Sequence, residues 1–278
     1  MKALFDEISI RSSRMVTKKY STSFSLGILF LNKDFRDPIY SIYGFVRFAD
    51  EIVDTFHDYN KNDLLDKFKA DTHQAIKEGI SLNPILNSFQ ETVRTYEIDI
   101  ELIDTFLKSM EMDLHKKQYS KDKYEEYILG SAEVVGLMCL KVFVNNDKAL
   151  YNELKPHAMK LGSAFQKINF LRDLHEDYCE MGRVYFPGVE MKEFNEECKR
   201  EIEEDIKRDF QAGFEGVKKL PKSSSFGVYV AYVYFYSLLK KIQNTPTNTI
   251  LNSRVRIQNS KKIILLLKSY LQHSFNLL

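Results

Sequence analysis

The sequence has few of the residues that interrupt helices. Its 278 residues include only 11 Gly and 6 Pro, and the long tracts between them carry apolar residues at spacings of three and four. No stretch alternates apolar and polar residues for long enough to predict a sheet. No fixed-period repeat, low-complexity linker or shift in composition marks a domain boundary. The sequence therefore predicts a single all-α domain over residues 1–278.

Cysteine is scarce, and neither sign of charge is in excess. Cys139, Cys179 and Cys198 are widely spaced and form no CxxC pair, which excludes a disulfide framework or zinc knuckle and fits a reducing cytoplasm. The 40 Lys and Arg are balanced by 39 Asp and Glu. No overall field then attracts nucleic acid or an anionic membrane, so nucleic acid is not expected as a partner. Any electrostatic effect must be local.

Long apolar runs are absent as well. The runs LGILFL at 26–31 and IILLL at 263–267 are far shorter than the roughly 20 residues that span a bilayer. The first 20 residues mix charges with apolar residues, unlike a signal peptide. We therefore expect a cytoplasmic protein, with peripheral membrane contact for product release left open. The sequence does not define an oligomeric state.

Apolar spacing places the expected helices, and the breaks between them coincide with turn-forming residues. The predicted helices are 38–57, 62–78, 84–95, 99–117, 122–145, 149–178, 191–217, 222–243 and 254–274. The breaks fall at Pro38, Asn83-Pro84, Asn145-Asn146-Asp147, Gly182, Pro187-Gly188, Pro221 and the segment NTPTN at 244–248.

The segment RFADEIVDTF, residues 47–56, crowds carboxylates beside apolar residues. Residues three and four apart share a face of a helix. The polar side chains of this segment therefore form one stripe, made of Tyr43, Arg47, Asp50 or Glu51, and Asp54. The opposite side of the helix is apolar.

A second stripe follows in QKINFLRDLHEDY. Its polar residues advance by three, four and four, as Gln166, Asn169, Asp173 and Asp177, with Arg172 and Glu176 beside them. One such segment alone is equally well explained as a solvated face, whose Arg–carboxylate pairs contribute only about 0.3–0.5 kcal/mol each.

Two similar stripes favour a shared site. Like charges at this spacing repel one another, so two helices that repeat the pattern are expected to face each other around a cation. Carboxylate and amide oxygens suit a hard ion such as Mg²⁺, which typically bridges a few carboxylates to substrate phosphates. Arg47 and Arg172 could complete a phosphate clamp. The implied ligand is a diphosphate.

Four segments, YGFVRFADEIVD, YILGSAEVVGLM, LGSAFQKINFLRDLHEDY and GRVYFP, together resemble the squalene and phytoene synthase family. The C-terminal tail from FGVYVAYVYF onward looks most like that of bacterial phytoene synthases. The likeness runs from YSTSFSLG at 20–27 to Lys262. It implies an isoprenoid synthase-type helical bundle around a central cavity. Ordinary prenyl chain-elongating enzymes carry DDxxD-type motifs, whereas this chain has DExxD and DxxED.

The resemblance also assigns roles to individual residues. It implies that Mg²⁺, or Mn²⁺, is held by Asp50, Asp54, Asn169, Asp173 and Asp177, with Glu51 and Glu176 in support. It implies that diphosphate oxygens are contacted by Ser21, Ser23, Arg47, Gln166, Arg172, Arg254 and Lys262. The cavity would be lined by Phe24, Tyr43, Tyr127 and Tyr185. Catalysis would depend on Arg47, Tyr43, Tyr185 and the four aspartates. Some relatives carry a tyrosine where this chain has Phe235.

Several of these residues have simpler interpretations. Ser21 and Ser23 are also N-cap candidates, and Lys262 could lie on a solvated helix face. Tyr127 and Tyr185 could be ordinary half-buried tyrosines. The small residues Gly130, Ala132 and Gly136 either permit close helix packing or leave room for a prenyl tail.

The implied reaction is the head-to-head condensation of two geranylgeranyl diphosphates to phytoene, through a cyclopropyl (prephytoene) diphosphate, in carotenoid biosynthesis. The alternative is squalene or dehydrosqualene synthesis from farnesyl diphosphate. NADPH is not expected, and no GxGxxG follows a predicted strand.

An alternative of another class is a non-catalytic assembly or binding protein of the same fold. The chain lacks the C-terminal anchor of eukaryotic squalene synthases, and both acidic motifs are intact.

Overall fold

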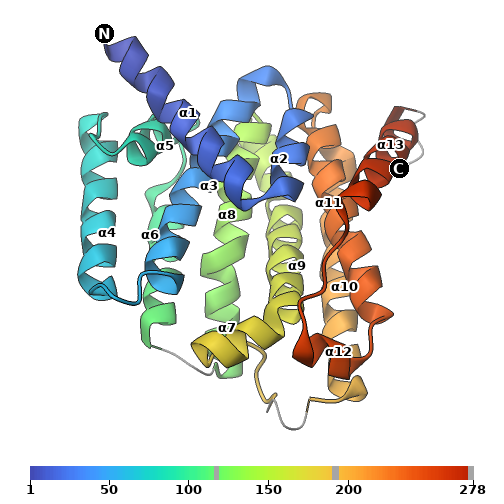
Figure 1. The fold of residues 1–278 in the computed structure, drawn as a ribbon. Coiled ribbons are helices and arrows are strands. Elements are labelled where there is room, and N and C mark those ends of the chain that lie inside the picture. Colours follow the sequence, from blue (N-terminus) through green and yellow to red (C-terminus); the bar gives the residue numbers. More distant parts are fainter. Residues whose placement is uncertain (116–118, 190–193, 275–278) are drawn as a thin grey trace.

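The computed structural model describes residues 1–115, 119–189 and 194–274, and within these ranges every regular element is a helix (Figure 1). The predicted all-α class is therefore confirmed. The elements are α1 (Lys2–Tyr20), α2 (Thr22–Leu29), α3 (Lys33–Asp54), α4 (Lys61–Glu78), α5 (Pro84–Thr95), α6 (Ile100–His115), α7 (Lys121–Ile128), the π-helix η1 (Leu129–Glu133), α8 (Val134–Phe143), α9 (Lys148–Met181), α10 (Glu196–Lys219), α11 (Lys222–Gln243), α12 (Thr247–Asn252) and α13 (Asn259–Ser274).

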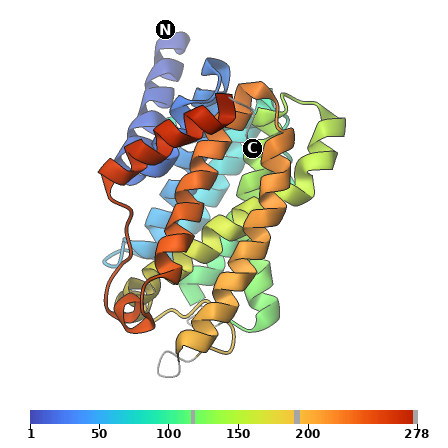
Figure 2. The same cartoon turned by 90° about the vertical axis from the view of Figure 1, so that its right-hand side faces the viewer.

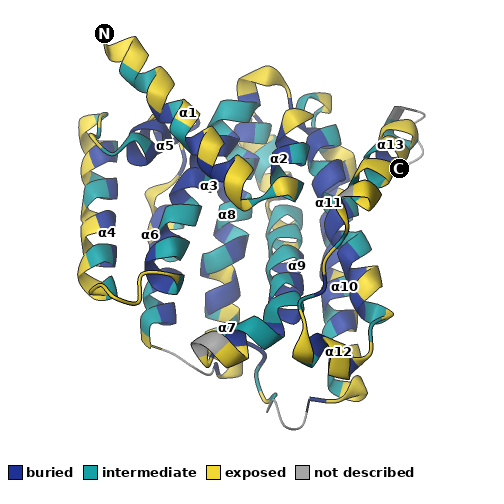
Figure 3. Cartoon of the chain, viewed as in Figure 1, coloured by how far each residue is buried: buried dark blue, intermediate teal, exposed yellow. Residues whose placement is uncertain are grey.

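The long helices run side by side along one common direction (Figures 1 and 2). The 34-residue helix α9 packs against α8 and η1 as well as against α10. Helices α4 and α5 form one edge of the bundle, whereas α13 packs on the outside of α11 at the other edge. Buried residues concentrate on the faces turned toward the middle of the bundle (Figure 3).

Two apolar clusters hold the bundle together. The first joins α3, α5, α6 and α8, and the rings of Phe45 and Phe89 stack at its centre with centroids 3.9 Å apart. The second joins α9, α10 and α11 to the segment after α9, where Phe170 stacks on Tyr185, also at 3.9 Å. The site described below lies between these two clusters.

Local signals account for most helix ends. Asn83 directly precedes Pro84, the first residue of α5. Its side chain accepts hydrogen bonds from the backbone N–H groups of Ile85 and Leu86, which is the expected pattern at a helix N-terminus. Helix α9 ends at Gly182, which adopts the left-handed conformation (φ 63°) that favours glycine. Predicted helices 84–95 and 222–243 match α5 and α11.

Other predicted boundaries were wrong. Helices α1, α2 and α12 were not predicted, and α3 begins at Lys33 and continues through Pro38 instead of starting there. Pro38 has no N–H for the carbonyl of Asp34, a loss that the surrounding packing offsets. The predicted helix 122–145 is divided into α7, η1 and α8, and the predicted helix 254–274 begins only at Asn259. Residues 116–117 and 191–193 of two other predicted helices lie outside the described ranges.

None of the helices in the described part of the chain is long and apolar enough to cross a bilayer.

Candidate active site

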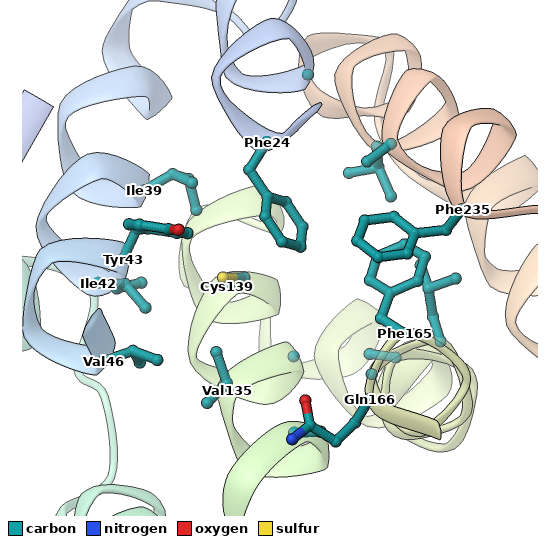
Figure 4. Close-up of a pocket in the computed structure, with 18 of the residues that line it drawn as sticks. Phe24, Ile39, Ile42, Tyr43, Val46, Val135, Cys139, Phe165, Gln166 and Phe235 are labelled. Carbon is teal, nitrogen blue, oxygen red and sulfur yellow. The ribbon is translucent and has the colours of Figure 1, made fainter. Parts of the chain in front are cut away.

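A cavity of about 490 Å³ lies between the two apolar clusters. Its walls come from α2, α3, η1, α8, α9, α10 and α11, so segments distant in sequence enclose it (Figure 4). Many residues predicted for the site line it, namely Ser21, Ser23, Phe24, Tyr43, Arg47, Asp50, Tyr127, Gln166, Asn169, Arg172 and Arg254.

The cavity has a polar end and a long apolar end. Along α9 the lining residues extend from Arg172 to Leu154, which is about 27 Å of helix at 1.5 Å per residue. Arg47, Arg172 and Arg254 lie with Asn169 at the polar end. The other end is lined by apolar side chains and glycines from α8, α10 and α11. This shape fits a ligand with a charged head and a long hydrocarbon tail.

Aromatic rings form part of the apolar wall. Phe235 stacks on Phe165 at 4.3 Å between centroids and contacts Phe24 at 5.3 Å, and Phe24 in turn lies 6.0 Å from Tyr43 (Figure 4). At position 235 the chain therefore places a ring without a hydroxyl among other rings. Ring faces stabilise nearby positive charge.

Arg47 holds the first acidic group in place at the polar end. Its guanidinium donates to Glu51 and lies 4.0 Å from Asp50, while the ring of Tyr20 lies 4.3 Å from its central carbon. Burial and, second, the negative charge of Asp54 together raise the pKa of Asp50 to about 8. The carboxyl group therefore lies in a region of unfavourable negative potential.

The second acidic group lies on α9 near two arginines. Arg172 Nε donates to Asp173 at 2.7 Å, and Arg254 Nε approaches the same carboxylate at 2.7 Å. Arg254 also donates to Glu176 at 3.0 Å. Two positive side chains thus converge on Asp173 beside the cavity mouth.

The two acidic groups act on each other across the bundle. The pKa of Asp177 is raised to about 8, chiefly by burial and then by the charges of Asp173 and Asp54. Asp54 belongs to α3 and Asp177 to α9, so the helices that carry the two stripes do face each other. Their carboxylates repel in the absence of a cation.

The available donors fit a divalent cation that arrives with its substrate. In residues 1–115, 119–189 and 194–274 no three His, Cys, Asp or Glu side chains converge into a ready-made metal site. Mg²⁺ usually binds through one or two carboxylates together with substrate phosphates and water, so a complete protein cage is not required. The Oδ1 atom of Asn169 is buried and has no hydrogen-bond partner. That oxygen and the carboxylates of Asp50 and Asp177, each of which is repelled by Asp54, suit a hard ion.

Sequence reasoning missed Asp113, the acceptor at the centre of a tyrosine cluster. This buried α6 carboxylate accepts hydrogen bonds from the hydroxyls of Tyr119 at 2.9 Å, Tyr127 at 2.6 Å and Tyr185 at 3.3 Å. Burial raises its pKa to about 6, although Arg183 and the hydroxyl of Tyr127 oppose the increase. Tyr127 and Tyr185 are thus members of one network instead of isolated half-buried tyrosines. In the sequence, Asp113 belongs to no charge pattern that could have revealed it.

Arg183 was also missed, although it lies within GRVYFP. It is 7% exposed. It donates to Asp54 Oδ1 at 2.7 Å and to the backbone carbonyls of Val53 at 3.3 Å and Asp113 at 3.1 Å. Nη1 bonds the carboxylate and Nη2 bonds both carbonyls, an arrangement of a planar guanidinium that a lysine could not reproduce.

The sequence model of squalene/phytoene synthases matches residues 17–261. The chain belongs to this family. Its relatives include phytoene synthase 1, chloroplastic, of Solanum lycopersicum, 27% identical over 275 residues that cover 92% of this chain and 66% of the relative. They also include 4,4'-diapophytoene synthase of Staphylococcus haemolyticus, 28% identical over 192 residues that cover 68% of this chain and 66% of the relative. The chain thus spans 66% of the length of each of these two proteins.

Solved structures share the fold. A dehydrosqualene synthase in complex with a ligand superimposes with a TM-score of 0.82 at 22% identity, over 96% of this chain and 98% of that one. Squalene synthase HpnC from Alicyclobacillus acidocaldarius gives a TM-score of 0.75 at 20% identity, over 85% of this chain and 93% of that one.

Some residues expected from the family resemblance lie outside the cavity lining, namely Asp54, Asp173, Asp177, Tyr185 and Lys262. The first four surround the polar end through the contacts given above. Lys262 Nζ donates to Thr22 Oγ1 at 2.6 Å, and both burial and the charge of Arg172 lower its pKa. It therefore lies beside the mouth and not on a solvated face.

The small residues of this family member divide into two groups. Ala132 and Gly136 line the cavity. Gly130 does not: a Cβ there would lie 2.6 Å from the Cβ of Ser109 and 2.7 Å from the carbonyl oxygen of Thr105. Gly130 therefore permits close packing of η1 on α6. Ser21 does cap α2, since its hydroxyl accepts from the backbone N–H of Phe24 at 3.2 Å.

Proposed function

We propose that the protein is a prenyltransferase that condenses two geranylgeranyl diphosphates head to head into phytoene, with release of diphosphate. One observation carries the proposal: a cavity that spans about 27 Å of α9 has a polar end that gathers arginines and mutually repelling carboxylates, and it continues into an aromatic and apolar tunnel. Membership of the squalene/phytoene synthase family and the likeness to phytoene synthase 1 support it.

The polar end would bind and orient the diphosphates. In the proposed site Asp50, Asp54, Asn169, Asp173 and Asp177 hold Mg²⁺ or Mn²⁺. The bound ion supplies Lewis-acid stabilisation of the diphosphate leaving group. Arginine matches phosphate oxygens in a bidentate fashion, so we assign Arg47, Arg172 and Arg254 to the diphosphate, with Ser21, Ser23, Gln166 and Lys262 nearby.

The apolar end would protect the carbocations. One prenyl diphosphate ionises and releases its diphosphate, its allylic carbon joins the double bond of the second molecule, and loss of a proton closes the ring of a cyclopropyl diphosphate. That intermediate ionises again, rearranges and loses a proton to give phytoene. Phe24, Tyr43, Phe165 and Phe235 present rings to the space where these cations form and exclude water from it. Loss of a proton ends the sequence, so NADPH is not required.

A second candidate is the same reaction on farnesyl diphosphate. The name of the relative from Staphylococcus haemolyticus, 4,4'-diapophytoene synthase, and the fold shared with a dehydrosqualene synthase favour it. A non-catalytic role is disfavoured because both acidic groups and the arginines that neutralise them are present.

Incubation with Mg²⁺ and each prenyl diphosphate, with and without NADPH, tests the proposal. We expect phytoene from geranylgeranyl diphosphate, at a rate that NADPH does not change. Asp50→Ala and Asp173→Ala should abolish turnover and leave the fold intact, whereas Asp66→Ala, at an exposed α4 position, should remain active. A preference for farnesyl diphosphate would replace the C20 assignment with the second candidate. Near-normal activity of both cavity variants would refute the proposed site.

A further inference from the structure

The outward face of α13 is apolar. Its side chains recur at helical spacing and are each between 56% and 65% exposed: Ile263, Ile264, Leu267, Tyr270 and Leu271. The inward face carries the polar contacts, since Tyr229 donates to Gln272 at 3.1 Å and Ser225 lies 3.2 Å from the ring nitrogen of His273. Leu265 and Leu266 are half-buried, so α13 carries apolar side chains on both faces, whereas the apolar stripe of a surface helix usually faces only the core. An exposed apolar stripe of this kind marks an interaction surface.

The apolar surface continues onto α2. Phe226 lies between the two helices, with its ring 5.9 Å from Tyr270 and 5.2 Å from Phe30. Phe30 and its neighbour Leu29 are 37% and 44% exposed. We call these residues the α13 patch, which consists of the five α13 side chains together with Phe226, Phe30 and Leu29. In Figures 1 and 2, α13 lies on the outside of the bundle.

The C-terminal part of the chain, which includes α13, carries charge of one sign. Residues 216–278 contain ten of the chain's 40 Lys and Arg and none of its 39 Asp and Glu. The expectation that composition does not shift along the chain is therefore wrong for charge, because the near-neutral total conceals a basic C-terminal quarter. Lys261 and Lys268 are exposed on α13 itself, and Lys222 and Arg256 are exposed on adjoining segments.

We propose that the α13 patch docks on the surface of an anionic lipid bilayer. Apolar side chains on a helix flanked by lysines are the features that place a helix in the headgroup region, and clustered basic residues favour anionic lipids. A second copy of the chain fits less well. A two-fold interface would bring one basic region against another, and like charges across an interface are unfavourable.

Docking through the α13 patch would bring the bilayer close to a wall of the cavity. Gly27 of α2 and Gly227 of α11 both line the cavity, and the helices approach so closely that a Cβ on Gly27 would lie 3.1 Å from the Gly227 carbonyl oxygen. Leu29 and Phe30 follow directly on α2. The docked surface is therefore the outer side of a cavity wall. If the proposed function holds, the hydrocarbon product has a short path to the bilayer; the docking itself does not depend on that function.

A fluorescent reporter can test the docking directly because the sequence contains no Trp. Leu267→Trp introduces a single indole in the α13 patch, and Leu82→Trp introduces one at a 91% exposed position between α4 and α5. With vesicles of phosphatidylcholine and phosphatidylglycerol, we expect a blue shift and quenching by brominated lipid for Leu267→Trp. The Leu82→Trp protein should show neither. No shift for Leu267→Trp, or equal shifts for both proteins, would overturn the proposal.

Vesicle flotation of the protein without Trp tests the charge requirement. Binding should be strong with phosphatidylglycerol, weak with phosphatidylcholine alone and lower at high salt. Lys261→Glu with Lys268→Glu should reduce binding by at least about fivefold for each lysine changed. The exposed α4 pair Lys67→Glu with Lys77→Glu makes the same change in net charge and should bind nearly as well as the parent. Equal losses in both double variants would show that only net charge matters, which would overturn the assignment to this surface.

The alternative occupant, a second copy, is tested by light scattering. We expect a mass in solution that does not change with Ile264→Ser and Leu267→Ser together, while vesicle binding by this double variant falls. A dimer that these substitutions dissociate, in a protein that does not bind vesicles, would overturn the proposal and assign the α13 patch to self-association. Thermal melts of each variant show whether the exposed substitutions leave the fold intact.

Discussion

Asp54, at the C-terminal end of α3, accepts a hydrogen bond of 2.7 Å from Arg183, which lies 129 residues further along the chain. Through the other side of its guanidinium, Arg183 also donates to the backbone of Asp113 on α6. One side chain thus joins the segment after α9 to two helices of the other apolar cluster. It also neutralises carboxylates that would otherwise repel.

Removing this buried cation should destabilise the fold. We expect Arg183→Met to lower the free energy of unfolding by about 3–5 kcal/mol, because it leaves buried carboxylate and carbonyl groups unpaired. Arg208→Met removes an exposed ion pair with Asp205, in which the Arg208 side chain is 66% exposed, and should change the free energy by less than about 0.5 kcal/mol. Urea denaturation measures both. Equal small effects would mean that Arg183 is dispensable.

Asp113 is predicted to act as a positioning residue. Asp113→Asn keeps the shape of the side chain but removes the negative charge that accepts hydrogen bonds from three tyrosine hydroxyls. Tyr127 and Tyr185 should therefore shift. We expect kcat to fall by about tenfold to a hundredfold with little change in KM. Asp209→Asn alters another buried acid, paired with Lys167 away from the cavity, and should lower stability but not kcat. Parallel losses of kcat in both variants would indicate a general effect of instability.

The raised pKa of Asp50 predicts how stability changes with pH. Its value of about 8, caused by burial and by the charge of Asp54, exceeds the ordinary value of 3.8. The folded chain therefore holds this proton more tightly. The resulting stabilisation is fully present below pH 3.8 and is lost as the pH rises through about 8. Metal-free protein should thus have a lower Tm at pH 9 than at pH 6, and Asp50→Asn should reduce the difference.

The expected effect of Asp50→Asn is a gain at high pH. At pH 9 its Tm should exceed that of the parent by roughly 2–4 °C for each kcal/mol of destabilisation relieved, and the difference should shrink as the pH falls toward 3.8. Asp66→Asn, on an exposed face of α4, should leave the pH profile unchanged. Profiles of the parent and Asp50→Asn that run parallel would contradict the assignment of the raised pKa to Asp50.

Arg47 should not tolerate lysine. Its planar guanidinium pairs with Glu51 and lies over the ring of Tyr20, and an ammonium group cannot reproduce both contacts. We expect Arg47→Lys to lose activity severely although the charge is kept. Steady-state kinetics with Mg²⁺ measure the effect. Indistinguishable kinetics of the Lys variant and the parent would make Arg47 a surface charge.

Cavity depth should respond to Ala132. Ala132→Phe fills the space beside α9, so we expect a preference for farnesyl over geranylgeranyl diphosphate, whereas Ala132→Gly should keep the parent preference. Overpacking costs about 1–3 kcal/mol, and a thermal melt separates that cost from substrate selection. A folded Ala132→Phe protein with unchanged substrate preference would show that the tail passes elsewhere.

The sequence predicted most of the long helices whose core faces are apolar, but it missed the long helix α1, whose core face is largely polar. Helix α1 packs against α3 and α5 through Ser9, Ser13 and Thr17, which are all fully buried. The Ser13 and Ser88 hydroxyls bond each other at 2.7 Å. Apolar periodicity cannot reveal a helix whose buried side chains are small hydroxyls, because the signal it measures is absent there.

In the candidate site too, the sequence revealed the residues that repeat at helical spacing and missed those that do not. The two acidic stripes were visible because each repeats one residue type at helical spacing, and the structure brings their helices face to face. Asp113 acts through partners at positions 119, 127 and 185, which become neighbours only in the folded chain. Its isolation in the sequence carries no information about them.

The π-helical segment Leu129–Glu133 affects how this chain can be aligned with its relatives. A π-turn accommodates one more residue than an α-turn, and each residue of an α-helix advances the face by 100°. The widened turn therefore keeps Tyr127 on the cavity side together with Ala132 and Gly136. Deleting a single residue between 129 and 133 would rotate Tyr127 away from Asp113. Alignments that pass through this segment without a gap would pair Tyr127 with a non-equivalent position in any relative whose helix is continuous there.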